Sequence, residues 1–162
     1  MLCFRQAHLV LFLFLLGILP VTISGCGAAL RSTRKAAHVR GELTLDVQVK
    51  PEVNHNSPVA VDIVLAKDKD VLKLLSAMSA EAWFQQRTDF ERSHPKKVQQ
   101  ISWEWVPGQD VGIVNVPGTG IANGVVLFAN YQTKGDHRAL LPQGGHVAIT
   151  FAADDFVIGS SK

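Results

Sequence analysis

Hydrophobic and polar residues alternate strictly in one early stretch of the chain. Residues 43–49 read LTLDVQV, so every second side chain from Leu43 to Val49 is apolar. This period of two predicts a β-strand with one face on a core and the other in solvent. Residues 59–66 (VAVDIVLA) form a β-branched run that predicts a second strand. The turn-rich segment 51–58 between them is longer than a tight hairpin needs, so the two strands need not form a simple hairpin.

The period changes to that of a helix after residue 67. Asp68 or Asp70 offers a carboxylate that can cap a helix start, and Ser79 offers a hydroxyl that can cap a second helix. Pro95 marks the end of the segment. The pattern therefore predicts one or two helices within about residues 69–92, inserted between strands. The apolar residues at helical spacing are Val71, Leu74, Leu75, Met78 and Ala82.

The rest of the chain consists of short apolar runs separated by turn signals. The expected strands lie near residues 101–105, 111–115, 124–131, 146–151 and 156–158. Prolines and glycines punctuate the stretches between them, which is typical of an all-β domain. About seven or eight short strands with one helical insertion predict a mostly β fold, a β-sandwich.

The first 25 residues differ in character from the rest. An almost wholly apolar run extends from Leu9 to Ile23 and follows a single full charge, Arg5. The run is shorter than the roughly twenty residues of a membrane-spanning helix, and it fits the core of a signal peptide. The sequence Ile23-Ser24-Gly25-Cys26 then resembles a bacterial lipobox, in which the cysteine is lipidated. We therefore expect residues 1–25 to be a cleaved lipoprotein signal peptide and Cys26 to be the lipid-attachment residue.

Processing at Cys26 would leave residues 26–41 as a lipidated tether and residues 42–162 as the folded domain. The alternative is an ordinary signal peptide that ends near a cysteine. Gly27 follows the cysteine in place of Asp, and resemblance to enterobacterial lipoproteins then implies the outer membrane. Because Cys3 leaves with the signal and lipid occupies Cys26, no thiol would remain for a disulfide, a metal or a nucleophile.

Charge and composition narrow the class of protein. The chain has 16 basic and 14 acidic residues, a formal net charge of +2, and no block of lysines and arginines. This balance argues against a nucleic-acid partner. With 47% hydrophobic and 19% charged residues, the chain is expected to fold.

Patterns typical of catalysis or metal binding are absent from the sequence. No histidine pair has metal-ligand spacing, and no G-x-S-x-G motif occurs. We expect His146 to be part-buried and the other histidines of the mature chain to be exposed. Asp154 and Asp155 are expected in a strand, on opposite faces, which argues against shared acid–base work. The prediction is a protein that is not an enzyme and has no cofactor besides the covalent lipid on Cys26.

Two features bear on binding. Trp103 and Trp105 alternate on one strand face and are expected in the core, although such a pair can also stack a sugar or a base. The loop from Pro51 to Pro58 contains Asn54, His55 and Asn56, which offer hydrogen-bond donors and acceptors. Loops on a rigid sandwich commonly carry recognition, and a plain connector is the alternative.

The order of these features resembles the TssJ family, the outer-membrane lipoproteins of the bacterial type VI secretion system. The lipobox precedes a strand that ends in an Asn-containing loop and a Pro-led second strand, PVAVDIVLA at residues 58–66. Next come the helical insertion and a strand that ends in Pro-Gly-Gln at 107–109. The last feature is the segment GVVLFANYQTKGDHR at 124–138. The resemblance covers about residues 26–152. It departs from the family where Asn54-His55-Asn56-Ser57-Pro58 replaces an Asn-Pro and Gly-x-Pro loop, and where His137-Arg138 replaces a Trp-Arg pair.

The resemblance implies a transthyretin-like β-sandwich with a short helical insertion on the periplasmic face of the outer membrane. It also implies binding to the periplasmic domain of TssM, an inner-membrane protein, with TssL in the same complex. In that family the loop between the first two strands contacts TssM. Mapped onto this chain, the loop is Lys50, Pro51, Glu52, Val53, Asn54, His55, Asn56, Ser57 and Pro58.

Three alternatives stay open. The first is a pilotin-like assembly lipoprotein of another envelope machine, which would bind a secretin or a barrel. The second is a small ligand-binding lipoprotein that uses the Trp103/Trp105 face, and it predicts an exposed aromatic patch. The third is an envelope hydrolase, and it predicts a cluster of His, Asp and Ser.

Overall fold

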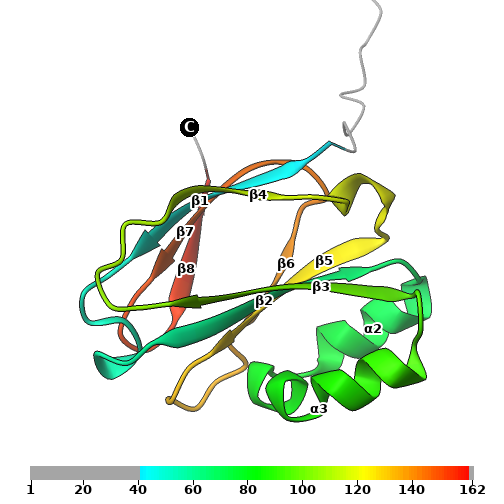
Figure 1. Ribbon diagram of the computed structural model, residues 1–162, viewed down its shortest axis with the longest axis horizontal. Helices are drawn as coiled ribbons and strands as arrows, with labels where there is room; N and C mark the ends of the chain where they lie inside the picture. The colour runs from blue at the N-terminus through cyan, green and yellow to red at the C-terminus, as the bar shows by residue number, and fades with distance from the viewer. Residues whose placement is uncertain (1–40, 161–162) are drawn as a thin grey trace, which may run out of the picture. The chain divides into compact units, whose positions relative to one another are not determined.

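The two strands that begin the domain lie in different sheets. The computed structural model describes residues 41–160, where eight strands form two four-stranded sheets (Figure 1). Sheet A has the order β4-β1-β7-β8, and sheet B has the order β3-β2-β5-β6. Because β1 (Leu43–Val49) lies in sheet A and β2 (Val59–Ala66) in sheet B, the loop between them crosses from one sheet to the other.

The remaining strands complete a sandwich with one parallel pair. Within the described chain, β1 and β7 run parallel, with Leu43 opposite Gly145 and Val49 opposite Phe151, and the other neighbours are antiparallel. The mostly β sandwich predicted from the sequence is thus confirmed. The strands are β3 (Val98–Trp105), β4 (Gly112–Val116), β5 (Gly124–Asn130), β6 (Arg138–Leu141), β7 (Gly145–Phe151) and β8 (Phe156–Ser160).

The main core fills the space between the two sheets. The alternating residues of β1, from Leu43 to Val49, point into it, as their period predicts. β2 is buried on both faces, which explains its nearly continuous apolar sequence. Its residues Val61 and Ile63 join the main core, whereas Val64 and Ala66 pack under the helices.

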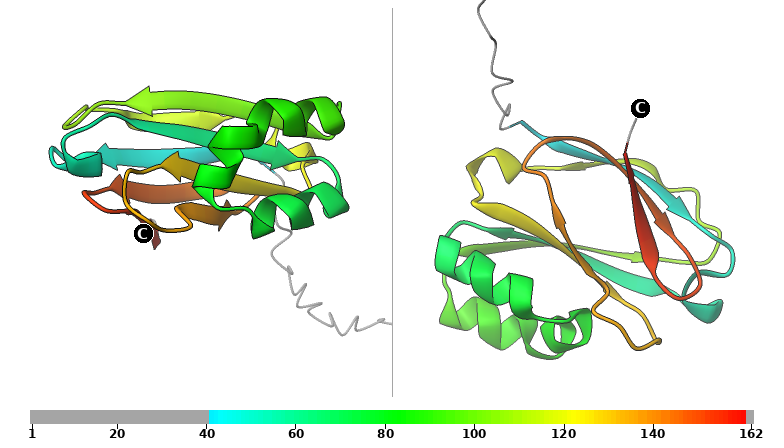
Figure 2. Two further views of the ribbon diagram at one scale, coloured as in Figure 1. Left: turned by 90° about the horizontal axis from the view of Figure 1, so that it is seen from below. Right: turned by 180° about the vertical axis from the view of Figure 1, so that it is seen from behind.

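Two helices, α2 (Lys69–Ala77) and α3 (Ala80–Ser93), pack on the outer face of sheet B, and no helix covers the outer face of sheet A in the described domain (Figure 2). The helical insertion predicted from the sequence is confirmed. Asp68 caps α2 by accepting the backbone N–H of Val71 at 3.1 Å, and Ser79 caps α3 by accepting that of Ala82 at 3.2 Å. The Val71 N–H and then the Lys97 ammonium, at 3.2 Å, lower the pKa of the Asp68 carboxyl.

A second core, between the helices and sheet B, is built around Trp83. Its indole stacks on Phe128 with ring centroids 5.2 Å apart and meets the edge of Phe90 at 5.8 Å. The indole Nε1–H donates to Oδ2 of Asp62 at 2.8 Å, and Arg87 donates to the same oxygen at 3.0 Å. Asp62 is 1% exposed, so these two donors hold α3 on the sheet through a buried carboxylate.

Several local predictions were wrong. The four-residue strand β6 has no counterpart in the sequence prediction, because it is a short edge strand that begins with Arg138. β3 starts at Val98, earlier than expected, since an edge strand accepts the polar Gln99 and Gln100. β4 spans Gly112–Val116 where a strand near residues 111–115 was expected; Val114 and Val116 pack on the core and Ile113 is exposed.

The lipoprotein features lie outside the described residues. The predicted signal peptide, Cys26 and nearly all of the tether fall within residues 1–40. Between residues 41 and 160, no helix has the length and apolarity needed to cross a membrane.

Candidate functional site

The loop Lys50–Pro58 lies at one end of the sandwich, where it meets three other connections (Figure 1). The Lys50 N–H donates to the Phe151 carbonyl at 2.9 Å, and the Gly108 N–H donates to the Lys50 carbonyl at 3.2 Å. The β3–β4, β5–β6 and β7–β8 connections (residues 106–111, 131–137 and 152–155) all contact the loop or one another. We call this region the four-loop end.

The middle of the loop is built into the protein. Val53 is fully buried in the main core, and Asn54 is only 3% exposed. The Asn54 side chain donates from Nδ2 to the Pro58 carbonyl at 2.8 Å and accepts the Gln132 N–H on Oδ1 at 2.8 Å. The Asn54 N–H donates to the Ala152 carbonyl at 3.3 Å. The loop is therefore fixed to both the β5–β6 and the β7–β8 connections.

The backbone at the tip of the loop has an unusual conformation. Asn54, His55 and Asn56 have φ angles of 45°, 53° and 60°, three left-handed residues in a row without a glycine. Asparagine tolerates this region better than most residues, and histidine pays a larger steric cost. The cost is offset by the contacts of Asn54, so the loop has one preset shape.

The other side of the loop faces solvent. Of the nine residues predicted to bind the partner, Val53 and Asn54 are buried, and Lys50 and Ser57 are half-buried. His55 places Nε2 3.0 Å from Oδ1 of Asp154, an exposed contact that joins the loop to the β7–β8 turn. The five exposed residues are Pro51, Glu52, His55, Asn56 and Pro58.

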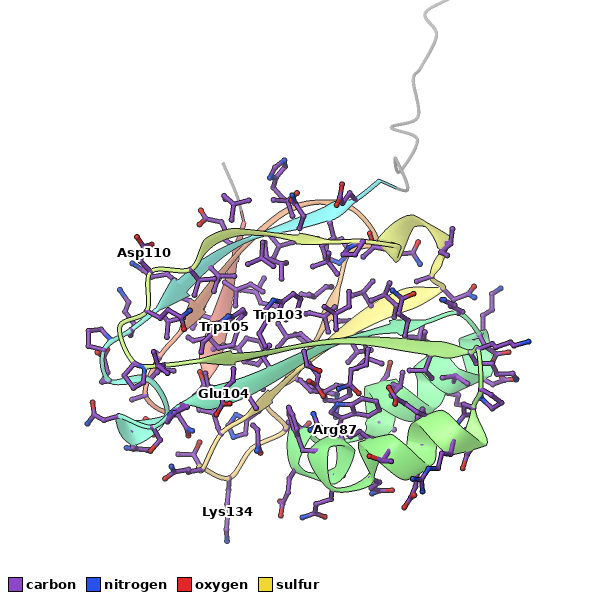
Figure 3. All side chains as sticks on the ribbon, viewed as in Figure 1. Arg87, Trp103, Glu104, Trp105, Asp110 and Lys134 are labelled. Carbon is purple, nitrogen blue, oxygen red and sulfur yellow. The ribbon has the colours of Figure 1, made fainter. Side chains whose placement is uncertain are left out.

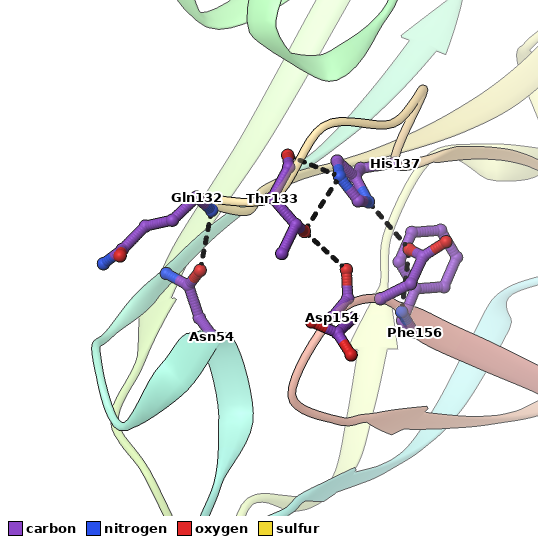
Figure 4. A network of polar contacts seen from close by, with 7 residues as sticks. Asn54, Gln132, Thr133, His137, Asp154 and Phe156 are labelled. Carbon is purple, nitrogen blue, oxygen red and sulfur yellow. Dashed lines mark hydrogen bonds and ion pairs between the residues drawn. The ribbon is translucent and has the colours of Figure 1, made fainter.

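A polar network links the connections behind the loop (Figure 4). His137 places Nδ1 3.0 Å from Oδ1 of Asp155 and Nε2 3.0 Å from the Thr133 carbonyl oxygen. The Thr133 hydroxyl donates to the Asp154 carbonyl at 2.7 Å. His137 is 7% exposed, so the prediction that it lies at the surface was wrong. Asp154 and Asp155 lie in a turn, not in the predicted strand, and His146 is exposed where part-burial was expected.

The network contains the residue types of a nucleophile–histidine–aspartate set but not its hydrogen bonding. The Thr133 hydroxyl has one proton, which it donates to Asp154, and it lies 3.4 Å from His137 Nε2. Nε2 lies closer to the Thr133 carbonyl oxygen, at 3.0 Å, than to the Thr133 hydroxyl, so the ring is not placed to take a proton from that hydroxyl. The arrangement holds two connections together and does not activate a hydroxyl. No group of three or more His, Cys, Asp or Glu residues suited to a metal ion occurs between residues 41 and 160.

Tyr131 lies beside the network and is also buried. Its ring centroid is 5.0 Å from that of His137, and its hydroxyl approaches the Ala152 backbone without the geometry of a hydrogen bond. Burial, and then the nearby Asp155 carboxylate, raises the pKa of Tyr131. The phenol is therefore a neutral neighbour of His137.

A polar cleft of about 640 Å³ opens between the loop, the start of α3 and the β5–β6 connection. Glu81 and Glu104 contribute exposed carboxylates to its wall, and Lys134 projects away from the domain (Figure 3). Polar side chains predominate in its lining, and its apolar members are mainly alanines, so the cleft does not have the composition of a typical small-molecule pocket.

The Trp103/Trp105 face does not form an exposed aromatic patch. Trp105 is 2% exposed and packs edge-on against Phe151, with centroids 4.8 Å apart. Trp103 is half-buried, stacks on Trp105 and packs on the main core, whereas Glu104 between them points outward (Figure 3). The pair is a core element, as the sequence predicts, and offers no stacking platform.

Replacing Asn54 by alanine tests how the loop is held. The variant leaves the Gln132 N–H and the Pro58 carbonyl without their side-chain partner. It also places an alanine, which has no polar side chain to stabilise this conformation, in the left-handed region. We expect the free energy of unfolding to fall by about 2–4 kcal/mol, measured by urea denaturation. Asn54→Gly is the matched control: it loses the same hydrogen bonds, but glycine adopts the left-handed backbone without strain, so it should be less destabilising than Asn54→Ala. If both variants are as stable as the parent, the Asn54 contacts do not hold the loop.

Comparison with known proteins identifies the fold. No family model and no curated protein match the chain. The solved structure of Lip from Serratia marcescens, a membrane-bound component of the type VI secretion system, aligns with a TM-score of 0.56 and 14% identity, over 75% of this chain and 99% of that chain. The type VI lipoprotein TssJ1 from Pseudomonas aeruginosa aligns with a TM-score of 0.57 and 14% identity, over 75% and 97% of the two chains.

A third structure is described as the TssM C-terminal domain (869-1107) from EAEC. One of its chains aligns with a TM-score of 0.57 and 16% identity, over 74% of this chain and 98% of that chain. The aligned part is shorter than this 162-residue chain, yet it spans almost all of the matched chain. The matched chain is therefore shorter than the 869-1107 span named for that structure. The chain thus has a TssJ-like fold, which agrees with the resemblance found in the sequence.

Proposed function

We propose that this protein is a divergent TssJ-type lipoprotein that anchors a type VI secretion membrane complex. Lipid on Cys26 would hold it at the periplasmic face of the outer membrane. The loop Lys50–Pro58 would bind the periplasmic domain of a TssM-like inner-membrane protein, with a TssL-like protein in the same complex. The observation that carries the proposal is the TssJ-like sandwich, with a rigid loop exposed at the position that the family resemblance assigns to the partner.

The shape of the loop suits a permanent structural contact. A loop that is already ordered loses little conformational entropy on binding, which favours affinity. The side chains available to the partner are the exposed set from Pro51 to Pro58, since Val53 and Asn54 face inward. The role is mechanical: the sandwich joins a lipid anchor to a partner, and catalysis has no part in it.

The proposal predicts that a tagged, detergent-extracted protein recovers a large inner-membrane protein with a periplasmic C-terminal domain. Mass spectrometry of the captured proteins would identify it together with a TssL-like companion. Recovery of a secretin instead would favour the pilotin-like alternative and overturn the assignment.

Exposed side chains at the loop tip should carry much of the affinity. Replacing His55 and Asn56 together by glycine keeps the left-handed backbone accessible and removes both side chains. We expect the affinity for the TssM-like domain to fall about tenfold or more, measured by calorimetry, with cooperative unfolding retained. A matched control replaces the exposed Gln85 and Gln86 of α3 by alanine and should bind like the parent. Equal affinity of the loop variant and the control would remove the loop from the interface.

A further inference from the structure

We propose that the end of the sandwich opposite the four-loop end is a membrane-contact face, which rests on a lipid surface with anionic headgroups. Ile121 enters the boundary between headgroups and acyl chains, and the lysines around it contact the headgroups. This inference rests on the lipid anchor at Cys26 in the proposed function and does not depend on the TssM-like partner.

The tether meets the domain at this end. β1 begins at Leu43 and runs toward the loop Lys50–Pro58, so residue 41 lies at the end away from the loop (Figure 1). Thr119 fixes the start of the domain, because its hydroxyl donates to the Gly41 carbonyl at 2.9 Å and accepts the Leu43 N–H at 3.2 Å. A bilayer that holds Cys26 is therefore connected to this end.

Hydrogen bonds join the connections that meet here. The side-chain amide of Asn123 donates to the Lys67 carbonyl at 2.8 Å, and the Lys67 N–H donates to the Lys97 carbonyl at 2.8 Å. The Gln143 side chain donates to the Ala122 carbonyl at 2.9 Å. We call this region the tether end; it comprises residues 41–42, 67–68, 94–97, 117–123 and 142–144.

Ile121 is the most exposed large hydrophobic residue between residues 41 and 160, at 71%. It lies in the one-turn 3₁₀ helix Thr119–Ile121, next to two anchored residues: Thr119 is fully buried, and Ala122 is 1% exposed. The turn cannot rotate to bury the isoleucine without exposing these neighbours. A single exposed isoleucine needs no explanation by itself, but this one is fixed beside the entry of a lipidated tether and among cations.

Lysines predominate among the charged residues around Ile121. Asp68 is already engaged, since it caps α2 and lies 3.2 Å from the Lys97 ammonium. The other acidic residues nearby are Glu42 and Asp70. Lysine stems are long enough to place their ammonium groups at the level of lipid headgroups. The cations are Lys67, Lys96 and Lys97, with Lys69 at the start of α2.

The tether extends this positive charge in the sequence. Residues 26–41 contain no carboxylate, since all 14 acidic residues of the chain lie at Glu42 or beyond it. Basic segments next to a lipid anchor are attracted to anionic headgroups and strengthen the hold of the acyl chains. The basic residues of the tether are Arg31, Arg34, Lys35 and Arg40.

The four-loop end carries the opposite charge. Its connections contain the carboxylates Glu52, Asp110, Asp136, Asp154 and Asp155, against the cations Lys50 and Lys134. An anionic bilayer would repel this end and attract the tether end. The charge distribution therefore turns the domain so that the binding loop points away from the membrane, where a partner from the inner membrane can reach it.

The length of the tether does not impose this contact. The residues between Cys26 and Gly41 could reach about 50 Å when extended, so the domain could stand well clear of the bilayer. Contact between Ile121 and lipid is thus a specific consequence of the face.

Methyl NMR of the lipidated protein in nanodiscs tests the face without any substitution. Gadolinium-chelate headgroups in discs of phosphatidylglycerol and phosphatidylcholine enhance the relaxation of nearby methyl groups. We expect the enhancement at the Ile121 δ1 methyl to exceed that at Ile113 about tenfold or more. Ile113 is the matched control, because it is 64% exposed but pairs with Asp46 in the middle of β1. Equal enhancement at the two methyls would overturn the face.

Charge reversal tests the role of the headgroups. Lys96→Glu should lower the enhancement at Ile121 about threefold or more, and discs of phosphatidylcholine alone should lower it in the parent. Lys134→Glu makes the same change at an exposed position of the four-loop end and should leave the enhancement at Ile121 unchanged. An enhancement that depends neither on Lys96 nor on the anionic lipid would overturn the proposed face.

The same experiment separates this inference from the proposed function. Protein that enters the discs but gives equal signals at Ile121 and Ile113 would overturn the face alone and leave the anchor in place. Protein that does not enter the discs would overturn the lipid anchor at Cys26, and the membrane-contact face with it.

Discussion

Replacing Trp83 by alanine should lower the free energy of unfolding by about 3–5 kcal/mol. The indole is fully buried between α3 and sheet B, so its removal leaves a cavity against Phe128 and Phe90. It also removes one of the two donors to the buried Asp62 carboxylate, whose Oδ1 has no hydrogen-bond partner among the described residues. Against a typical domain stability of about 5–15 kcal/mol, this loss is a large share of the total.

Circular dichroism during urea and thermal denaturation would measure the change, with a decrease in Tm of roughly 15 °C expected. Trp83→Phe is the matched control, since it keeps an aromatic ring on Phe128 and loses only the Nε1–H. It should lose less than half as much stability as Trp83→Ala. A variant Trp83→Ala that unfolds like the parent would mean that the second core is not required for the fold.

Replacing Cys26 by serine should abolish lipidation completely and remove the protein from the outer-membrane fraction. A hydroxyl at this position cannot form the thioether to diacylglyceryl. Each buried methylene of an acyl chain contributes about 0.8 kcal/mol to membrane partition, so loss of all the chains removes the anchor. Palmitate labelling and membrane fractionation measure the two effects.

The matched control for Cys26→Ser is Cys3→Ser. Cys3 lies at the start of the predicted signal peptide, so its substitution should change neither labelling nor fractionation. Normal labelling of Cys26→Ser, or loss of labelling in Cys3→Ser, would contradict the assignment of Cys26.

Elements with a strong local pattern could be predicted from the sequence. The alternation from Leu43 to Val49 identifies both a strand and its buried face, because one face of β1 packs on the core along its whole length. Asp68 or Asp70 and Ser79 indicated the starts of two helices, because capping depends on neighbours three residues away, and the structure selects Asp68 for α2. The β6 strand carries no such signal, because pairing with β5 and not its own sequence makes it a strand.

The interior of the candidate site could not be predicted, because its contacts join residues far apart in the chain. Asn54 and Gln132 are 78 positions apart, and His137 and Asp155 are 18 apart. Each residue taken alone reads as part of a polar turn. The loop was identified as a candidate from its composition and from a family resemblance, but the burial of Val53 and Asn54 appears only once the connections of both sheets come together at one end.

The position of β1 has a mechanical consequence for a protein proposed to sit between a membrane and a partner. The tether would enter β1 at Leu43, and the proposed binding loop leaves it at Val49, so tension between the two would run along this strand. β1 is flanked by β4 on one side and β7 on the other. The hydrogen bonds from β1 to β4 and β7 lie across the direction of the pull, perpendicular in the antiparallel pair and slanted in the parallel pair. Such a pull loads many of these bonds at the same time, in shear, and does not break them one after another. The domain should therefore resist this pulling direction far better than a pull that unzips the edge strand β8.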